Sequence, residues 1–513
     1  MGVEASLQPA EPPEHLSHRE AWVQLNKLNT IVIPHDPEDH QARRWACIEN
    51  YPPDLKVPIQ RGGNEVVYLI DGRETLPQFQ CEIEKTGGPG DFIYLLGWFL
   101  DIDLVFPDAG FIAGRSMRDL LTEKAKAGVK IRVMLDAQWH EGNSKNEAAI
   151  QFLESLSQHG AKYVPALSQS WRSDSVAGGV FDDHFALDGS HHQKTLIVKA
   201  GNQLTAFCGG VDINPDRVHQ VGDGTPQHDV HCRIRGPAAG DVLKIFCDRW
   251  NDFMTQYGYP AAEKTIGQGI PAPNPCGDFH VQICRTFGHI TTAPYQFAPQ
   301  GEQSIRKLIE RAIEASQRFI YIEDQYLTEL GVAKLIGKHL PNIKHVTILI
   351  PPPHFNQAMG PDRLRFIDTL RERAAEKVRV YFPSFSIDGC STYVHAKTWI
   401  FDDKLAIIGS ANCNYRGLTH DSEVSAGIYD ASNDSTLTYT FAHRLRIKLW
   451  AHHLGMDTDE GHAELADGVA SADHWWGGPN CRVSRFWDAP GRVPRAESAA
   501  GGTLIDPKEP GDN

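Results

Sequence analysis

Short apolar runs alternate with a helical pattern between residues 61 and 135. Runs of strand length lie at 66–70, 92–100 and 129–135. Between the last two, residues 116–127 have the spacing of a helix, with Ser116 placed to cap its first turn and Gly128 just beyond its end. The pattern predicts three strands, a turn at 71–72 after the first of them, and one helix.

The same alternation returns in the second part of the chain. Residues 304–316 predict a helix whose apolar face consists of Ile305, Leu308, Ile309, Ala312 and Ile313. Strands are expected at 319–322 and 346–350, and the prolines at 351–353 end the second of them. Helices that alternate with strands favour α/β layers.

Less regular segments divide the chain into units. Residues 1–60 predict an irregular, proline-containing lead-in, and residues 263–277 predict a linker rich in proline and glycine. We therefore expect two α/β halves, at 61–262 and 278–455. A loosely packed tail is expected at 456–513, where the apolar rhythm fades.

Composition is typical of a globular protein, with 41% hydrophobic and 22% charged residues. The net charge of −15 disfavours a surface that attracts nucleic acid over its whole extent, although a local basic groove stays compatible with it. The apolar run at 92–100 is closed by Asp91 and Asp101 and is too short to cross a bilayer. We expect no transmembrane segment and no nucleic-acid partner.

The first twenty residues are polar and lack the apolar core of a signal peptide. The expected location is therefore the cytoplasm, and peripheral association with membranes is compatible with it. Ten cysteines stand singly, without a Cys-x-x-Cys pair. A zinc ribbon is therefore disfavoured, and most of these cysteines are expected to be small buried hydrophobic residues.

A His-x-Lys motif occurs twice, as His192-x-Lys194 and His395-x-Lys397, and each copy leads into an apolar run. Residues two apart on a strand share a face, so each histidine should lie beside its lysine. A histidine can attack phosphorus or move a proton near neutral pH, and a lysine supplies charge for phosphate oxygens. The repeat predicts two similar mixed α/β-sheet halves packed around one shared active site.

Small residues, an asparagine and a carboxylate follow each motif. In the first half these are Gly209, Gly210, Asn214 and Asp229; in the second they are Ser410, Asn412 and Glu423. Small residues let backbone amides approach a phosphate, and a carboxylate can fix the tautomer of a catalytic histidine. The asparagines are alternatively turn formers, and the carboxylates are alternatively ordinary residues at strand ends.

These motifs resemble the phospholipase D superfamily. The second copy, His395-x-Lys397-x4-Asp402-x6-Gly409-Ser410-x-Asn412, matches the family signature in full, and the first half resembles the eukaryotic and plant branch through Gly209-Gly210-Val211-Asp212, His228-Asp229-Val230-His231 and Gly236-Pro237-Ala238-Ala239. Further matches are Tyr68-Leu69-Ile70-Asp71-Gly72, Gly97-Trp98 and Tyr321-Ile322-Glu323-Asp324-Gln325-Tyr326. One departure is Lys199, which stands where the first copy should carry an aspartate.

The resemblance implies a phosphodiesterase that hydrolyses glycerophospholipids such as phosphatidylcholine to phosphatidic acid and the free head-group alcohol, with transphosphatidylation. His192 would form a phosphohistidine and His395 would protonate the leaving alcohol, although the reverse assignment stays open. Lys194, Lys397, Asn412 and Ser410 would hold the charged oxygens. Asp229 and Glu423 would pair with the histidines, and Asp402, included with the candidate catalytic residues, would mainly support the structure.

No cofactor or metal is expected, since the spacing of His191, His192, His228 and His231 matches no recognised ligand set. The expected partner is a phospholipid at a membrane surface, and the chain is expected to be a monomer. Two alternatives stay open: a nuclease or other phosphodiesterase with the same site, and an inactive lipid-binding relative, which Lys199 favours.

Overall fold

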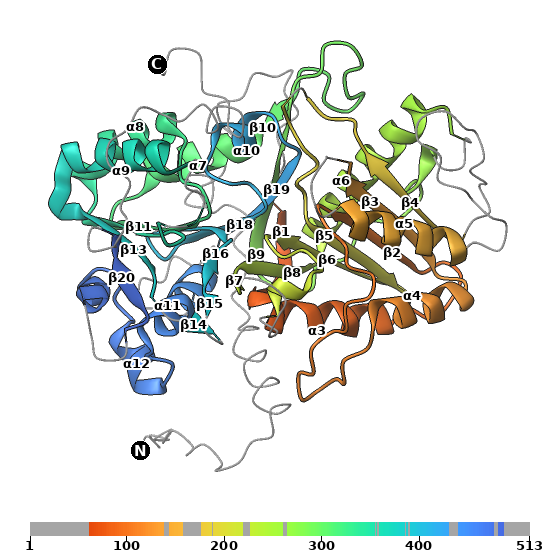
Figure 1. Ribbon diagram of the computed structural model, residues 1–513, viewed down its shortest axis with the longest axis horizontal. Coiled ribbons are helices and arrows are strands. Elements are labelled where there is room, and N and C mark those ends of the chain that lie inside the picture. Colours follow the sequence, from red (N-terminus) through yellow and green to blue (C-terminus); the bar gives the residue numbers. More distant parts are fainter. Residues whose placement is uncertain are drawn as a thin grey trace, which may run out of the picture.

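The fold is seen in a computed structural model that describes residues 61–137, 143–156, 176–186, 188–218, 226–259, 264–353, 355, 359–384, 386–387, 390–429, 440–476 and 481–486 (Figure 1). The predicted lead-in at 1–60 lies outside the described residues. We call residues 61–259 the N-terminal part and residues 264–486 the C-terminal part.

The N-terminal part contains β1 (Arg61–Ile70), α3 (Asp71–Glu84), β2 (Phe92–Gly97), α4 (Met117–Lys126), β3 (Lys130–Asp136), α5 (Asn143–Leu156), β4 (Ala177–Asp182), β5 (Thr195–Ala200), β6 (Gln203–Gly209), the 3-10 turn η2 (Pro215–Arg217), β7 (Gln227–His228), β8 (Val230–Arg235) and α6 (Pro237–Gln256).

The C-terminal part contains β9 (Phe279–Phe287), β10 (Glu302–Gln303), α7 (Ser304–Ala315), β11 (Phe319–Asp324), α8 (Leu330–His339), η4 (Leu340–Asn342), β12 (His345–Leu349), α9 (Gly360–Ala374), η6 (Ala375–Lys377), β13 (Val378–Pro383), β14 (Ser386–Ile387), β15 (Cys390–Ser391), β16 (Tyr393–Val394), β17 (Lys397–Phe401), β18 (Leu405–Gly409), α10 (Tyr415–Thr419), β19 (Glu423–Tyr429), α11 (Phe441–Leu454), α12 (Asp459–Glu464), η7 (Ala470–Trp476) and β20 (Val483–Arg485).

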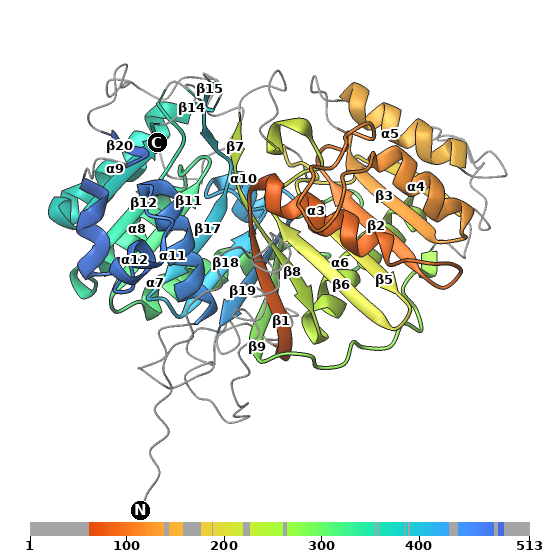
Figure 2. The same cartoon turned by 90° about the horizontal axis from the view of Figure 1, so that it is seen from below.

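Sixteen of the described strands form one mixed sheet that runs through both parts, so the predicted α/β class is confirmed. From the central pair, the order is β1-β8-β6-β5-β2-β3-β4 on one side and β9-β19-β18-β17-β11-β12-β13-β20 on the other, and β10, the sixteenth strand, pairs with β9. Within this sheet, the described strands pair parallel in β2-β3-β4 and β11-β12-β13, toward its two ends. Figures 1 and 2 show β1 and β9 side by side at the centre of the molecule.

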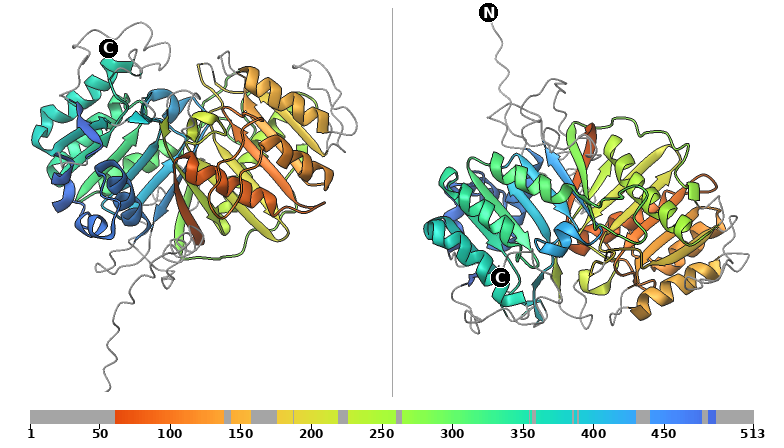
Figure 3. Two further views of the ribbon diagram at one scale, coloured as in Figure 1. Left: turned by 60° about the horizontal axis from the view of Figure 1, so that its bottom comes forward. Right: turned by 90° about the horizontal axis from the view of Figure 1, so that it is seen from above.

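Helices cover the sheet on both faces, and the hydrophobic core has three regions. In the N-terminal part, α3, α4 and α5 enclose one region; in the C-terminal part, α7, α8 and α9 enclose another. The third region includes α6 and α11 and takes residues from both parts, so the two parts share a core. Figure 3 shows the two parts side by side from two further directions. Cys208 of β6 lies with its Sγ 3.9 Å from the carbonyl oxygen of Ile408 in β18.

Most of the predicted elements between 61 and 350 are confirmed by β1, β2, β3, β11, β12, α4 and α7. The cap of α4 is also confirmed, because the Asp119 amide donates to Ser116 Oγ at 3.1 Å. The turn predicted at 71–72 was wrong, since α3 begins at Asp71. Asp71 has a φ of +59°, which turns the chain directly into the helix. A Cβ on Gly72 would lie 2.3 Å from the Arg217 carbonyl oxygen, so the close approach there requires glycine.

The predicted tail is not loosely packed throughout. Residues 459–464 form α12, residues 470–476 form η7, and β20 pairs antiparallel with β13 at the edge of the sheet. Leu465 and Ala472 are fully buried in the shared core. Their burial shows that a few apolar side chains suffice to pack this largely polar segment.

Candidate active site

The two His-x-Lys motifs lead into strands β5 and β17, as the sequence indicates. Strand β5 begins at Thr195 and β17 at Lys397, so both histidines lie on the segments just before these strands. Each segment is hydrogen-bonded across the molecule: the His192 amide donates to the Ser422 carbonyl at 3.1 Å, and the His395 amide donates to the His228 carbonyl at 2.8 Å. The backbone therefore joins each motif to the other part of the chain.

Each histidine pairs with a carboxylate from the other part. His192 Nδ1 lies 2.7 Å from Glu423 Oε1, and His395 Nδ1 lies 2.7 Å from Asp229 Oδ2. We call these two contacts the crossed pairs. All four side chains are buried, with the histidines 6% and 3% exposed. With Nδ1 engaged by a carboxylate, Nε2 is the ring nitrogen left to act on a substrate.

Both motif lysines lie beside their histidines. Lys194 Nζ donates to the His192 carbonyl at 3.0 Å and lies 3.4 Å from Asp212 Oδ2. Lys397 Nζ donates to Gln325 Oε1 at 2.8 Å and also donates to the His395 carbonyl. The structure thus brings two histidines and two ammonium groups together at the interface of the two parts.

Burial governs the ionisation of these groups. It lowers the pKa of His192 and of His395 well below the usual value, with Lys194 adding to the effect at His192 and Arg217 at His395. It lowers the pKa of Lys397, and it raises the pKa of Glu423 to about 7 against the attraction of Lys194. A buried neutral imidazole has a lone pair available for attack or for accepting a proton.

The predicted small residues make room for the protein's own side chains. A Cβ on Gly210 would lie 2.0 Å from Asp229 Oδ1, and one on Gly209 would lie 2.6 Å from His231 Nδ1. Ser410 donates its hydroxyl proton to Glu423 Oε2. Serine and glycine at these positions therefore let the two carboxylates of the crossed pairs come close to β6 and β18.

The two predicted asparagines each bring a polar atom to the buried region. Within the described part of the chain, Asn412 Oδ1 and Asn214 Oδ1 are enclosed without a hydrogen-bond partner. Buried polar atoms are rarely left so, and a ligand is one way to satisfy them.

Asp402 lies at the other end of β17, apart from the crossed pairs. Its carboxylate accepts from the amides of Gln317, Arg318 and Phe319 at 2.6–2.8 Å, which fixes the start of β11. Lys199 occupies the position in the first motif that Asp402 occupies in the second. It pairs with Phe92 of β2, and its Nζ donates to the Gly90 carbonyl at 2.9 Å. The departure from the family motif therefore lies at a strand end and leaves the His192 pair intact.

A second cluster, which the sequence pattern did not indicate, lies behind His395. His228 Nδ1 is 2.8 Å from Asp71 Oδ1, its Nε2 is 2.9 Å from Glu323 Oε2, and His453 Nε2 is 2.8 Å from Glu323 Oε1. These are hydrogen-bond lengths, whereas two ligands of one tetrahedral zinc ion lie roughly 3.3 Å apart. The cluster is thus a hydrogen-bond network. The signal in the sequence was that His228 directly precedes Asp229.

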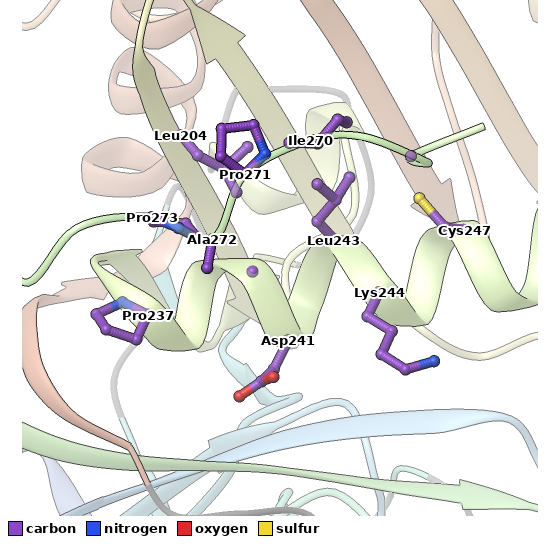
Figure 4. A pocket seen from close by; sticks show the side chains of 12 residues that line it. Leu204, Pro237, Asp241, Leu243, Lys244, Cys247, Ile270, Pro271, Ala272 and Pro273 are labelled. Atoms are coloured by element: carbon purple, nitrogen blue, oxygen red, sulfur yellow. The ribbon is translucent and has the colours of Figure 1, made fainter.

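A cavity of about 300 Å³ lies elsewhere, between α6 and residues 267–273 (Figure 4). Its walls are mainly apolar, from residues such as Leu204, Leu243 and Ile270, and none of the crossed-pair residues line it. In the described part of the chain, no helix combines the length and the apolar character needed to cross a bilayer.

Comparison with known proteins identifies two overlapping family matches. Residues 216–346 match the family described as "Phospholipase D", and residues 309–445 match the family described as "Cardiolipin synthase, PLD-like domain". Similar curated proteins include phospholipase D alpha 1 of Cynara cardunculus, 25% identical over 84% of this chain and 70% of that protein. Phospholipase D1 of Schizosaccharomyces pombe is 28% identical over 84% of this chain and 38% of that protein. The major cardiolipin synthase ClsA of Bacillus subtilis is 25% identical over 75% of this chain and 69% of that protein.

Proposed function

Since the chain belongs to the phospholipase D superfamily and is a phosphodiesterase of that type, we propose that it hydrolyses glycerophospholipids such as phosphatidylcholine to phosphatidic acid and the free head-group alcohol. The substrate would be taken from a membrane surface by a protein in the cytoplasm. The observation that carries the proposal is the pair of buried histidines, each held by a carboxylate from the other part of the chain at 2.7 Å.

We further propose that the two parts are an internal repeat around this one site. The order of strands supports it, because it reads alike outward from the β1–β9 pair: β5 with β17, β6 with β18, and β2-β3-β4 with β11-β12-β13. A repeat of this kind brings two His-x-Lys motifs to one phosphate.

In the first step, His192 Nε2 attacks phosphorus and a phosphorus–nitrogen bond forms. The negative charge of the bound diester favours the imidazolium form of His395. The bond from phosphorus to the head-group oxygen breaks, and the imidazolium of His395 gives that oxygen its Nε2 proton. Glu423 accepts the Nδ1 proton of His192 in a hydrogen bond and stabilises the positive ring, as Asp229 does for His395.

In the second step, His395 takes a proton from water, and the oxygen of that water displaces His192 from phosphorus. Lys194 and Lys397 neutralise the phosphoryl oxygens in both steps. Asn412 and Asn214 are proposed as further phosphate contacts, and Ser410, Gly209 and Gly210 support the site through the two carboxylates. A small primary alcohol that replaces water yields a phosphatidyl alcohol.

The covalent step is tested by adding ethanol or butanol to the reaction. Phosphatidyl alcohol should form while phosphatidic acid falls in step, and His192→Ala should abolish both products. Acid-quenched digestion and mass spectrometry should locate the phosphoryl group on His192. An adduct on His395 alone reverses the two roles, and the absence of both transfer and adduct removes the covalent mechanism.

The head-group preference is tested with a panel of phospholipids and one nucleotide diester, with products separated by thin-layer chromatography. Cleavage of the phospholipids is expected, because the net charge of −15 disfavours a nucleic-acid surface. Cleavage of the nucleotide diester alone would favour the nuclease alternative, and turnover of any diester excludes the inactive relative.

A further inference from the structure

His228 lies in a buried network that includes residues of both parts. Its ring bridges two carboxylates, Asp71 at 2.8 Å and Glu323 at 2.9 Å. Glu323 Oε1 also accepts from His453 Nε2 and, at 2.6 Å, from the Tyr321 hydroxyl. Asp71 and His228 come from the N-terminal part, and the other groups come from the C-terminal part.

The network contacts the His395 pair through the backbone. The Asp229 amide donates to Asp71 Oδ1 at 2.9 Å, and the Asp71 amide donates to the Asp229 carbonyl at 2.8 Å. The His228 carbonyl accepts from the amides of His395, at 2.8 Å, and of Ala396, at 3.1 Å. A shift of His228 would therefore move both members of the His395–Asp229 pair.

The charges around His228 favour its imidazolium form. Burial opposes a charged ring, but Asp71 and Glu323 outweigh it and raise the pKa of His228 well above the usual value. Two further rings face His228. The ring centroid of His452 lies 5.6 Å away in a stacked arrangement, and that of His453 lies 4.8 Å away, edge to face. Burial lowers the pKa of both, so they add little positive charge.

Among the described residues, no counterpart of His228 supports His192. The residue that accepts its amide hydrogen bond is Ser422, at the position that corresponds to His228. The Ser422 hydroxyl donates to the Ser190 carbonyl at 3.1 Å, and no ring can bridge two carboxylates there. The groups behind the two active-site histidines therefore differ although their backbone contacts match. Behind His395 a histidine lies between two carboxylates, whereas on the His192 side the Ser190 hydroxyl donates to Asp421 at 3.0 Å and accepts from Arg416 at 3.1 Å.

We propose that His228, hydrogen-bonded between Asp71 and Glu323, is a positioning residue that keeps Asp229 ionised and aligned with His395, and that this contact assigns the acid–base role to His395. The inference rests on the proposed function. Burial raises the pKa of Asp229, and the positive charges of Lys397, Arg217 and, more weakly, His228 oppose that rise. An ionised Asp229 stabilises the imidazolium that protonates a leaving alcohol.

The test compares two diesters that differ in how strongly the departure of their leaving group depends on a general acid. An alkyl leaving group must be protonated, whereas a nitrophenolate departs without a proton. His228→Gln should lower kcat/KM for the alkyl diester by about 100-fold, and for the nitrophenyl diester by no more than about threefold. Equal losses for both substrates would overturn the proposal, because a structural effect does not depend on the leaving group.

His191→Gln provides the matched control. His191 is also fully buried, pairs with Asp182 at 3.0 Å, and stands next to the other active-site histidine. It should lower the rates of the two diesters by similar factors. If His228→Gln does not fold, Asp71→Asn tests the same contact, because it removes one carboxylate from His228 and keeps the side-chain volume.

Nuclear magnetic resonance of histidine labelled at Cε1 separates this inference from the proposed function. In the wild-type protein the His228 signal should stay in the imidazolium range between about pH 6 and 8, because the pKa of His228 lies well above the ordinary histidine pKa of about 6.5. In Asp71→Asn or His228→Gln the pKa of His395 should fall. An unchanged pKa of His395 in these variants would overturn the inference even if the protein hydrolyses diesters. The expected fall in the pKa of His395 would support the inference even if the protein hydrolyses no diester.

Discussion

Glu423 lies 2.7 Å from the ring of His192 although 231 positions separate the two residues. The reciprocal contact joins Asp229 to His395 across 166 positions. Neither part of the chain therefore holds a complete crossed pair, and the two crossed pairs exist only where the two parts meet.

Fragments divided near Gly269 should each be inactive. Each fragment contains one of the two crossed-pair histidines together with the carboxylate that pairs with the histidine of the other fragment. Co-expression of the two fragments should restore part of the activity through the shared core. Turnover of a diester and size-exclusion chromatography are the measurements. An active, monomeric single fragment would contradict the crossed pairs.

Gly210→Ala should lower activity by at least about 100-fold, because the new methyl group would stand 2.0 Å from Asp229 Oδ1 and push it away from His395. Gly87→Ala is the control, since no atom lies within 4 Å of the Cβ that it would add. Steady-state rates and thermal unfolding of both variants are compared. Full activity in folded Gly210→Ala would remove Asp229 from the mechanism.

Activity should fall as the pH is lowered through about 7, because burial raises the pKa of Glu423 to that value and the protonated carboxyl no longer stabilises the positive ring of His192. On the alkaline side activity should decline earlier than an ordinary lysine would allow, since burial lowers the pKa of Lys397. The pH profiles of kcat/KM for wild type, Glu423→Gln and Lys397→Arg measure both limbs. Glu423→Gln should be slower and lose the acidic limb, and Lys397→Arg should lose the alkaline one.

Asp402→Ala should destabilise the fold by about 2–3 kcal/mol, because three backbone amides lose their hydrogen-bond acceptor. The folded variant should keep most of its catalytic rate, because Asp402 makes no contact with the crossed pairs. Urea unfolding and turnover per folded molecule give the two quantities. Lys199→Ala removes a single exposed hydrogen bond and should cost less. A large loss of rate with unchanged stability would make Asp402 catalytic.

Activity should survive excess EDTA, because histidines and lysines supply the charge that the proposed steps need. The measurement is turnover of a diester in detergent solution before and after dialysis against the chelator. Complete loss, restored by one divalent ion, would contradict the expectation.

The sequence indicated which candidate residues belong together, but not how they pair. The duplicated motif singled out His192 and His395 as candidates, and the chain order of Asp229 and Glu423 suggested a carboxylate for each. It could not show that the pairs are crossed, because that depends on tertiary hydrogen bonds such as the one from the His395 amide to the His228 carbonyl. Helix α3 was missed because residues 71–72 were interpreted as a turn, and the positive φ of Asp71 does turn the chain at the first residue of that helix.

The pairing of β1 with β9 has a consequence for how a substrate enters. Because one hydrogen-bonded sheet and one apolar core run from part to part, the two parts cannot swing open about a hinge without breaking both. The proposed lipid substrate would therefore reach the histidines along a path bounded by side chains and short segments, and we expect the distance between His192 and His395 to change little when the site is filled.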